Sequence, residues 1–152
     1  MKSKIDPRHT ARKIALSSLF CWLFTEPHRE ECNLLAKELL EIPADTHDQN
    51  LTDLIIEGVK ENLKGIDEII AEAAPEWPID KISKVDLIIL RIAIFEIIYG
   101  KKTPIKVSID EAVELAKEFG NDTSHKFVNG VLGTVSEKYT EKEVNVETIA
   151  NE

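Results

Sequence analysis

Apolar residues recur along the chain at helical spacing, and the densest run extends from Ile82 to Tyr99. Its apolar residues fall on nearly every side of a helical projection, which indicates a helix that is buried all round. The run is far longer than a typical β-strand of about 5–6 residues. Ser83 and Asp86 have the spacing of an N-terminal capping box, and Gly100 can end the helix. We therefore predict a central core helix on which the rest of the chain packs.

A membrane-spanning helix is the competing interpretation of this run. The run contains the charged residues Lys84, Asp86, Arg91 and Glu96, and an Arg or Asp at the centre of a bilayer costs about 2.5–3.5 kcal/mol. The sequence therefore predicts no membrane association. An unpaired buried charge is also costly in a protein core, so Arg91 and Glu96 are expected to form an internal ion pair or to contact a partner. Asp86 and Arg91 are the candidate protein-interface residues.

The other helices are predicted from apolar spacing and from helix-start signals. Ser108 and Glu111 form a second capping box, and Gly65 is expected to separate two consecutive helices. Trp77 lies in a proline-containing segment that cannot be helical, and it is expected to anchor that corner by packing. The further helical segments are 6–22, 25–40, 51–63, 66–73, 108–119 and 123–139. Because no pair of strands is apparent, the sequence predicts an all-α fold of about seven helices.

The chain of 152 residues is long enough to form one domain with a sizeable core. We assign residues 1–140 to a single all-helical domain. The apolar period fades after Tyr139, and residues 141–152 are acidic, so this tail is expected to fray or to be disordered. Gly130 and Gly133 lie inside the last helix, where glycine costs about 0.5–1 kcal/mol relative to alanine. Close approach of another helix explains Gly130 best, and close approach of a ligand stays open for Gly133.

The net charge of −9 argues against a general nucleic-acid binder, because phosphate contact draws on Lys and Arg. The charge is unevenly distributed, since residues 1–13 are basic and the tail from Glu141 is acidic. Any RNA site must therefore be local. The amino terminus lacks the apolar segment of a secretory signal. Cys21 and Cys32 lack metal-site spacing, so reduced thiols in a cytoplasmic protein are expected.

The first predicted helix places an apolar face beside a basic one. The basic face carries the RNA-binding candidates Arg8, His9, Arg12, Lys13 and Phe20. On pattern alone, this is a solvated face with Phe20 at the margin of the core. The alternative is a phosphate-binding strip beside a ring on which a base could stack.

The sequence contains no recognisable catalytic constellation. The four histidines are scattered, and none pairs with another at the i, i+4 spacing of a helical metal site. Neither of the common glycine-rich phosphate loops occurs. We therefore predict that the chain is not an enzyme and that it holds no metal and no cofactor.

Three segments together resemble the NusB family of bacterial transcription antitermination factors. They are residues 85–96 (VDLIILRIAIFE), 109–120 (IDEAVELAKEFG) and 124–132 (SHKFVNGVL), and they occur in the family's order. The first helix fits the same family more weakly. The resemblance implies two small helix bundles that share the central helix, and this agrees with the helices predicted from the pattern.

The resemblance also implies a function and a set of RNA-binding residues. It implies binding of boxA-type single-stranded RNA together with NusE, a ribosomal small-subunit protein. Other Nus factors and RNA polymerase join such a complex, which keeps transcription of ribosomal RNA operons processive. The family's arginine-rich first helix maps onto residues 8–12, and its aromatic residue on that helix maps onto Phe20. Its later RNA-side motif maps onto Lys126 and Phe127.

This chain departs from the family pattern at several positions. His9 and Thr10 thin the arginine run, the common glutamine is Ser17, and the acid that often follows VNGVL is Gly133. Fewer cations imply greater reliance on the protein partner for RNA affinity.

Two alternatives from other classes stay open. One is a helical protein-interaction module with weak or no RNA binding, which the acidic balance supports. The other is the RNA-binding module of ribosomal RNA cytosine methyltransferases, although a chain of 152 residues leaves no room for a catalytic domain.

Overall fold

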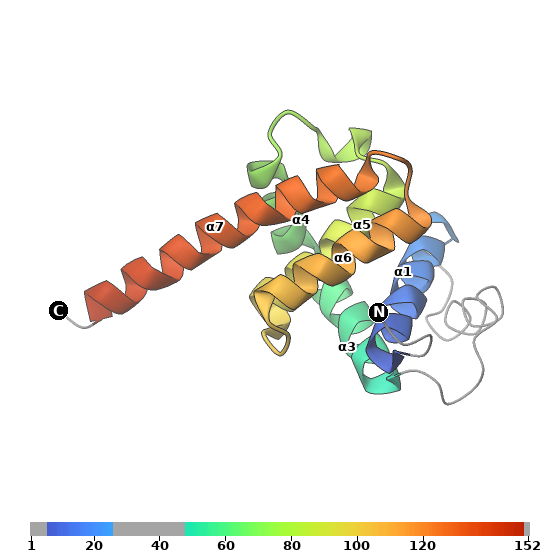
Figure 1. Ribbon diagram of the computed structural model, residues 1–152, viewed down its shortest axis with the longest axis horizontal. Helices are drawn as coiled ribbons and strands as arrows, with labels where there is room; N and C mark the ends of the chain where they lie inside the picture. The colour runs from blue at the N-terminus through green and yellow to red at the C-terminus, as the bar shows by residue number, and fades with distance from the viewer. Residues whose placement is uncertain (1–5, 26–47, 151–152) are drawn as a thin grey trace.

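The computed structural model describes residues 6–25 and 48–150, and every regular element in these ranges is helical (Figure 1). The prediction of an all-α fold is confirmed. Nearly all of the helix predicted over residues 25–40 lies outside the described residues. In chain order the elements are α1 (Pro7–Thr25), α3 (Gln49–Glu61), α4 (Leu63–Ala73), the 3₁₀-helix η1 (Ile79–Lys81), α5 (Lys84–Ile94), the π-helical segment η2 (Phe95–Gly100), α6 (Ile105–Phe119) and α7 (Ser124–Ala150).

The predicted central helix is α5 together with η2. Residues 86–97 are all buried, which explains why apolar side chains occur on every face of this helix. Each of α1, α3, α4, α6 and α7 contacts α5. In addition, α1 packs on α3, whereas α7 packs on α6 and α4. Figure 1 shows α5 between these groups, as expected for helix groups that share one central helix.

The central helix ends at Gly100, as predicted, and its last turn is π-helical rather than α-helical. The backbone N–H of Lys101 donates to the carbonyl of Glu96 at 3.0 Å, which is the wide i to i−5 pattern of a π-helix. Lys101 then adopts a left-handed conformation with φ of 54°, which is uncommon for a residue other than glycine. The turn buries Phe95, Glu96 and Ile97 in succession. A carboxylate is thereby placed in the core.

The two predicted capping boxes have different outcomes. At the start of α5, Ser83 Oγ accepts a hydrogen bond from the backbone N–H of Asp86 at 3.2 Å, so Ser83 caps this helix as predicted. The prediction that Ser108 caps a helix is wrong. Helix α6 already begins at Ile105, directly after Pro104, and Ser108 is buried inside it. Proline is favoured at helix starts because its φ is fixed near the helical value.

Two further boundaries differ from the sequence-based prediction. The break between α3 and α4 falls at Asn62, whose Nδ2 donates to the Gly58 carbonyl at 2.8 Å, and Gly65 lies within α4. Helix α7 continues to Ala150 instead of ending near Tyr139, and it projects beyond the other helices (Figure 1). Loss of the apolar period removes packing partners but leaves good helix formers such as Glu and Lys in place.

The glycines differ in what surrounds them. A Cβ at Gly58 would collide with the ring of Phe95, so α3 approaches the central helix closely only because glycine is present. At Gly130 and Gly133, apart from the neighbouring residues and backbone of α7 itself, no described atom lies within 4 Å of the position that a Cβ would take. The explanation of Gly130 by a closely packed helix is therefore wrong.

We predict opposite effects for two glycine-to-alanine substitutions. Gly58→Ala should destabilise the fold by about 1–3 kcal/mol, because the buried Phe95 ring must move. Gly130→Ala should stabilise it by about 0.4–1 kcal/mol, because alanine restricts the unfolded chain and meets open space. Urea unfolding of the two variants measures both changes. Equal effects of the two substitutions would contradict the packing of α3 on Phe95.

Candidate RNA interface

Arg12, predicted on a solvated basic face, is only 2% exposed. Its Nε and Nη2 donate to the two carboxylate oxygens of Glu96, each at 3.0 Å, which is a bidentate ion pair. Its Nη1 lies 3.9 Å from Glu111 Oε2. The placement of Arg12 on a solvated face is therefore wrong. The helical wheel could not reveal this, because the acid that Arg12 meets is 84 residues away in the sequence.

Acidic residues of α6 also face the other basic residues of α1. His9 Nδ1 lies 2.6 Å from Glu111 Oε2, and His9 Nε2 lies 3.5 Å from Glu118 Oε2. Lys13 Nζ lies 2.5 Å from Glu118 Oε1 and 6.0 Å from the centre of the Phe119 ring. Most of the predicted basic strip is therefore engaged within the protein. These contacts were not foreseen from the sequence, because Glu111 was assigned to a helix cap and no local pattern links Glu118 to α1.

Arg8 is the exposed cation of this set, at the first turn of α1. Asp6 caps that turn by accepting hydrogen bonds from the backbone N–H groups of Arg8 and His9 at 3.1 and 3.4 Å. Arg8 lines a groove of about 240 Å³ between α1, the start of α3 and the turn after η2, where Lys102 also lies. Phe20 is half-buried and packs against the core, as the pattern-based interpretation expected. Arg8 thus retains the solvent access that phosphate contact requires.

Arg91 forms the internal ion pair that the sequence analysis left as one of two alternatives. Its Nε and Nη2 donate to Asp67 Oδ1 and Oδ2 of α4 at 2.9 and 3.0 Å. The Arg91 side chain is 9% exposed and that of Asp67 is 25% exposed. This pair joins α4 to the central helix. Its geometry supports packing, and the assignment of Arg91 to a protein interface stays a prediction.

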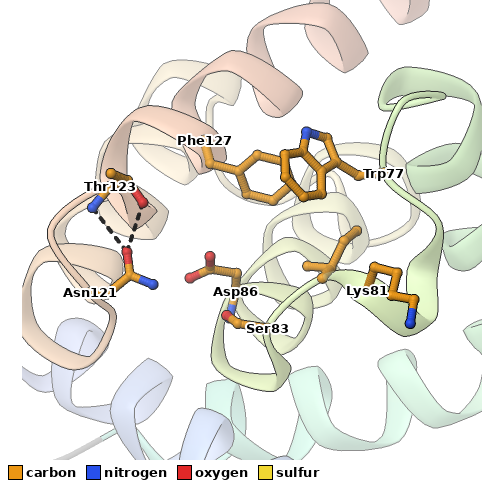
Figure 2. A pocket seen from close by; sticks show the side chains of 8 residues that line it. Trp77, Lys81, Ser83, Asp86, Asn121, Thr123 and Phe127 are labelled. Carbon is orange, nitrogen blue, oxygen red and sulfur yellow. Dashed lines mark hydrogen bonds between the residues drawn. The ribbon is translucent and has the colours of Figure 1, made fainter.

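A cavity of about 250 Å³ lies where the start of α5, the α6–α7 turn and the loop after α4 meet (Figure 2). Phe127 and Trp77 form one wall with an edge-to-face contact, 6.1 Å between ring centres and 74° between planes. Trp77 is 51% exposed, so about half of its side chain is not packed at this corner. Lys126, beside Phe127 on α7, is exposed. The remaining lining residues are Lys81, Ile82, Ser83, Asp86, Asn121 and Thr123.

Asp86 places a buried carboxylate in this cavity. The residue is 6% exposed, and among the described residues no hydrogen-bond partner reaches its Oδ1. A buried acceptor without a partner is costly. The cavity therefore combines aromatic surface with an acceptor that a ligand could satisfy. Trp77 and the α6–α7 turn were not identified as site residues from the sequence, because only the fold brings them to Asp86.

The two groups of predicted RNA-binding residues lie at different places in the fold. Arg8 is at the start of α1, beside α3, whereas Lys126 and Phe127 are at the start of α7 (Figure 1). Lys13 lies on the side of α1 that faces α6, where it reaches Glu118 and the Phe119 ring. In the described ranges, no group of three or more His, Cys, Asp or Glu side chains has the arrangement of a metal site. No described helix is long and apolar enough to cross a membrane.

Residues 9–137 match the model of the NusB family. The chain belongs to the NusB family. Transcription antitermination protein NusB of Chloroflexus aggregans is 43% identical over 143 residues, which cover 92% of this chain and 94% of that protein. NusB of Roseiflexus castenholzii is 42% identical over 137 residues, which cover 89% and 95%. The sequence-based recognition of the family is confirmed.

Solved structures agree with this assignment. Thermotoga maritima NusB has a TM-score of 0.72 and 35% identity, and the match covers 90% of this chain and 93% of that one. A chain from a crystal structure of antitermination factors NusB and NusE in complex with dsRNA has a TM-score of 0.72 and 23% identity, and covers 86% and 96%. The second likeness shows a shared fold. NusB proteins are antitermination factors rather than enzymes, so the prediction of a non-enzymatic protein is confirmed.

We predict that the buried position of Arg12 makes its replacement costly. Arg12→Met leaves the Glu96 carboxylate buried without its bidentate partner and should destabilise the fold by about 3–5 kcal/mol. Arg8→Met, on the exposed first turn, should change stability by less than about 0.5 kcal/mol. Chemical denaturation measures both.

A double variant separates loss of the charge pair from loss of packing. Arg12→Met combined with Glu96→Met removes the orphaned carboxylate and should recover more than half of the lost stability. If Arg12→Met costs no more than Arg8→Met, Arg12 is not held as the structure shows.

Proposed function

We propose that the chain binds boxA-type single-stranded RNA together with a NusE-type ribosomal protein and supports transcription of ribosomal RNA operons in the cytoplasm. In this role it joins other Nus factors and RNA polymerase. The relatives named above are transcription antitermination proteins, and one structure of the same fold contains NusB, NusE and double-stranded RNA. These likenesses support the proposal.

The cavity beside Phe127 is the observation that carries the RNA part of the proposal. Single-stranded RNA is recognised by unstacked bases that meet aromatic faces and polar acceptors. The Trp77–Phe127 pair supplies exposed aromatic surface, and Asp86 supplies the acceptor. Lys81 and Lys126 are exposed next to these groups and can meet phosphate. Bases and backbone thus have complementary groups in one small region.

The pairing within α1 supports dependence on a protein partner. His9, Arg12 and Lys13 all face carboxylates, so few cations of α1 are available to phosphate. RNA affinity that rests on phosphate contact should then be weak for the isolated chain. A basic ribosomal protein bound beside it would add the missing positive charge.

Binding of a boxA-type RNA oligonucleotide, with and without the ribosomal partner, tests the proposal. We expect weak binding by the chain alone, and much tighter binding by the two proteins together than by either one. A scrambled RNA of the same composition is the control. If neither the chain nor the pair prefers the boxA-type RNA, the chain acts as a protein-interaction module, which the paired charges of α1 would favour.

We predict a purely electrostatic role for Arg8. Arg8→Gln should weaken RNA binding several-fold for all sequences and reduce the slope of log affinity against log salt by about 0.7, because one phosphate contact is lost. Lys64→Gln, on the exposed side of α4, makes the same charge change as a control and should have no effect. Titrations at several salt concentrations measure both slopes, and equal slopes would remove Arg8 from the interface.

We predict a stacking role for Phe127. Phe127→Leu keeps apolar volume but removes the ring, and base stacking on an aromatic side chain contributes about 1–3 kcal/mol. RNA affinity should fall by roughly 5–150-fold, with little change in melting temperature because Phe127 is only partly buried. Tyr139→Leu removes a ring farther along α7 and should leave RNA affinity unchanged. Unchanged affinity in both variants would assign Phe127 to packing alone.

A further inference from the structure

The groove that Arg8 lines is at the opposite end of the central helix from the cavity beside Phe127. Its volume is about 240 Å³, and its other walls are the start of α3 and the turn that follows η2. The Asp48 backbone N–H donates to the Pro7 carbonyl at 3.1 Å, so the first turns of α1 and α3 are joined here (Figure 1). The fold itself therefore holds the walls of this groove.

Several hydrogen-bond donors line the groove without a partner in the protein. No described residue pairs with the guanidinium of Arg8 or the ammonium of Lys102, and both residues are exposed. Thr103 is only 8% exposed, yet its hydroxyl forms no hydrogen bond with a described residue. Asn50 adds a side-chain amide. Two cations, a buried hydroxyl and an amide are thus available to a ligand.

The two carboxylates of the groove are already engaged. Asp48 Oδ1 accepts from the Leu51 backbone N–H at 3.0 Å as the cap of α3, where the helix terminus also favours a negative charge. Glu96 forms the bidentate pair with Arg12. The two unpaired cations therefore meet acids whose charges are already compensated. The groove attracts an anion.

The turn after η2 directs two neighbouring lysines to different sides. Lys101 has the left-handed φ of 54°, and its Nζ lies 5.2 Å from the centre of the Tyr139 ring on α7. Lys102, the next residue, lines the groove instead. Pro104 then fixes the backbone where α6 begins. This arrangement places one lysine against α7 and leaves the other for a ligand.

A phosphate of RNA fits these donors better than a carboxylate of a protein does. The donors belong to α1, to α3 and to the turn after η2, so they come from three sides. A phosphodiester presents tetrahedrally arranged oxygens, which accept from several directions, whereas the two oxygens of a carboxylate lie in one plane. Arg, Lys, Thr and Asn are also side chains that contact phosphate oxygens in complexes with nucleic acids.

The groove and the cavity beside Phe127 are far enough apart to contact different nucleotides. Ser83 lines the cavity and Gly100 lines the groove, and the helical path between them covers roughly 25 Å at about 1.5 Å per residue. A strand stacked at about 3.4 Å per nucleotide would place about seven nucleotides over this length. An RNA held at both places must therefore extend over several nucleotides.

We infer that the groove between Arg8, Lys102 and Thr103 binds a backbone phosphate of single-stranded RNA, several nucleotides away from the base that meets Phe127. This inference rests on the proposed RNA-binding function and adds Lys102 and Thr103 to it. Arg8 and Lys102 supply charge, and the Thr103 hydroxyl donates a hydrogen bond. The groove binds RNA of any sequence, because the phosphate is the same in every nucleotide.

The test neutralises the phosphates of a boxA-type RNA with flanking nucleotides, one at a time, by methylphosphonate linkages. Each such linkage replaces a charged oxygen by a methyl group. At one linkage or two adjacent ones, the change should weaken binding to the chain with its ribosomal partner by about tenfold, because hydrogen bonds to a charged group are lost there. That position should lie several nucleotides from the base whose contact Phe127→Leu removes.

Three variants connect this loss to the groove. Lys102→Gln should weaken binding several-fold and lower the slope of log affinity against log salt by about 0.7. Thr103→Val removes the hydroxyl and should weaken binding several-fold without changing the slope. In both variants the penalty for the neutral linkage should shrink, because the two changes remove the same contact. Lys106→Gln makes the same charge change at an exposed residue outside the groove and should keep the full penalty. Thermal unfolding checks that all three are folded.

The outcomes distinguish this inference from the proposed function. If the RNA binds with boxA preference but Lys102→Gln behaves like Lys106→Gln, or if the linkage penalty persists in full in Lys102→Gln and Thr103→Val, the phosphate site is overturned while RNA binding stands. If Lys102→Gln weakens binding of the ribosomal protein without RNA and leaves the linkage penalty intact, the groove receives an acidic side chain instead. If no RNA binds under any condition, the proposed function and the phosphate site fall together.

Discussion

The position of α1 depends on the bidentate ion pair between Arg12 and Glu96. Both side chains are almost fully buried, at 3% and 5% exposure, so each charge is tolerable only while the other is in place. The π-helical turn brings Glu96 into the core, and Glu111 of α6 approaches the same guanidinium. One cation thereby joins α1 to the central helix and to α6. A shift of α1 that moved Arg12 away from Glu96 would leave the buried Glu96 carboxylate without its bidentate partner.

This arrangement also limits which cations of this acidic protein are available to contact phosphate. The acids of α6 engage most of the cations of α1, which limits general attraction to phosphate. The cations that remain exposed in these two helices include Arg8 in the first turn of α1 and Lys126 at the start of α7. A surface with so few free cations attracts phosphate only weakly, so under the proposed function specificity would have to come from base contacts and a partner protein.

Rigid elements hold the cavity beside Phe127. Phe127 is in the first turn of α7 and Asp86 is in the first turn of α5, whose start Ser83 caps. Asn121 and Thr123 are fixed to each other within the α6–α7 turn. Because the fold already places these groups, a ligand bound there would not have to order them. An unsatisfied buried acceptor in such a setting costs stability and is compensated when a donor binds.

The sequence by itself determined the helical class, the central helix and the family. These follow from local signals, since apolar spacing, the cap at Ser83 and the segments around residues 85–96 and 124–132 are each contained within one stretch of chain. The helix boundaries at Asn62 and Ile105 and the length of α7 were missed, because competing local signals at Gly65, Ser108 and Tyr139 had similar strength.

Only the tertiary structure decided which charged residues face solvent. A helical wheel places Arg12 beside Arg8 and Lys13, yet Arg12 is buried because Glu96, far along the chain, lies opposite it. The contact between Trp77 and Phe127 likewise joins residues far apart in the sequence, and no local pattern links them. Burial and ion pairing are properties of two surfaces in contact, whereas periodicity describes only one.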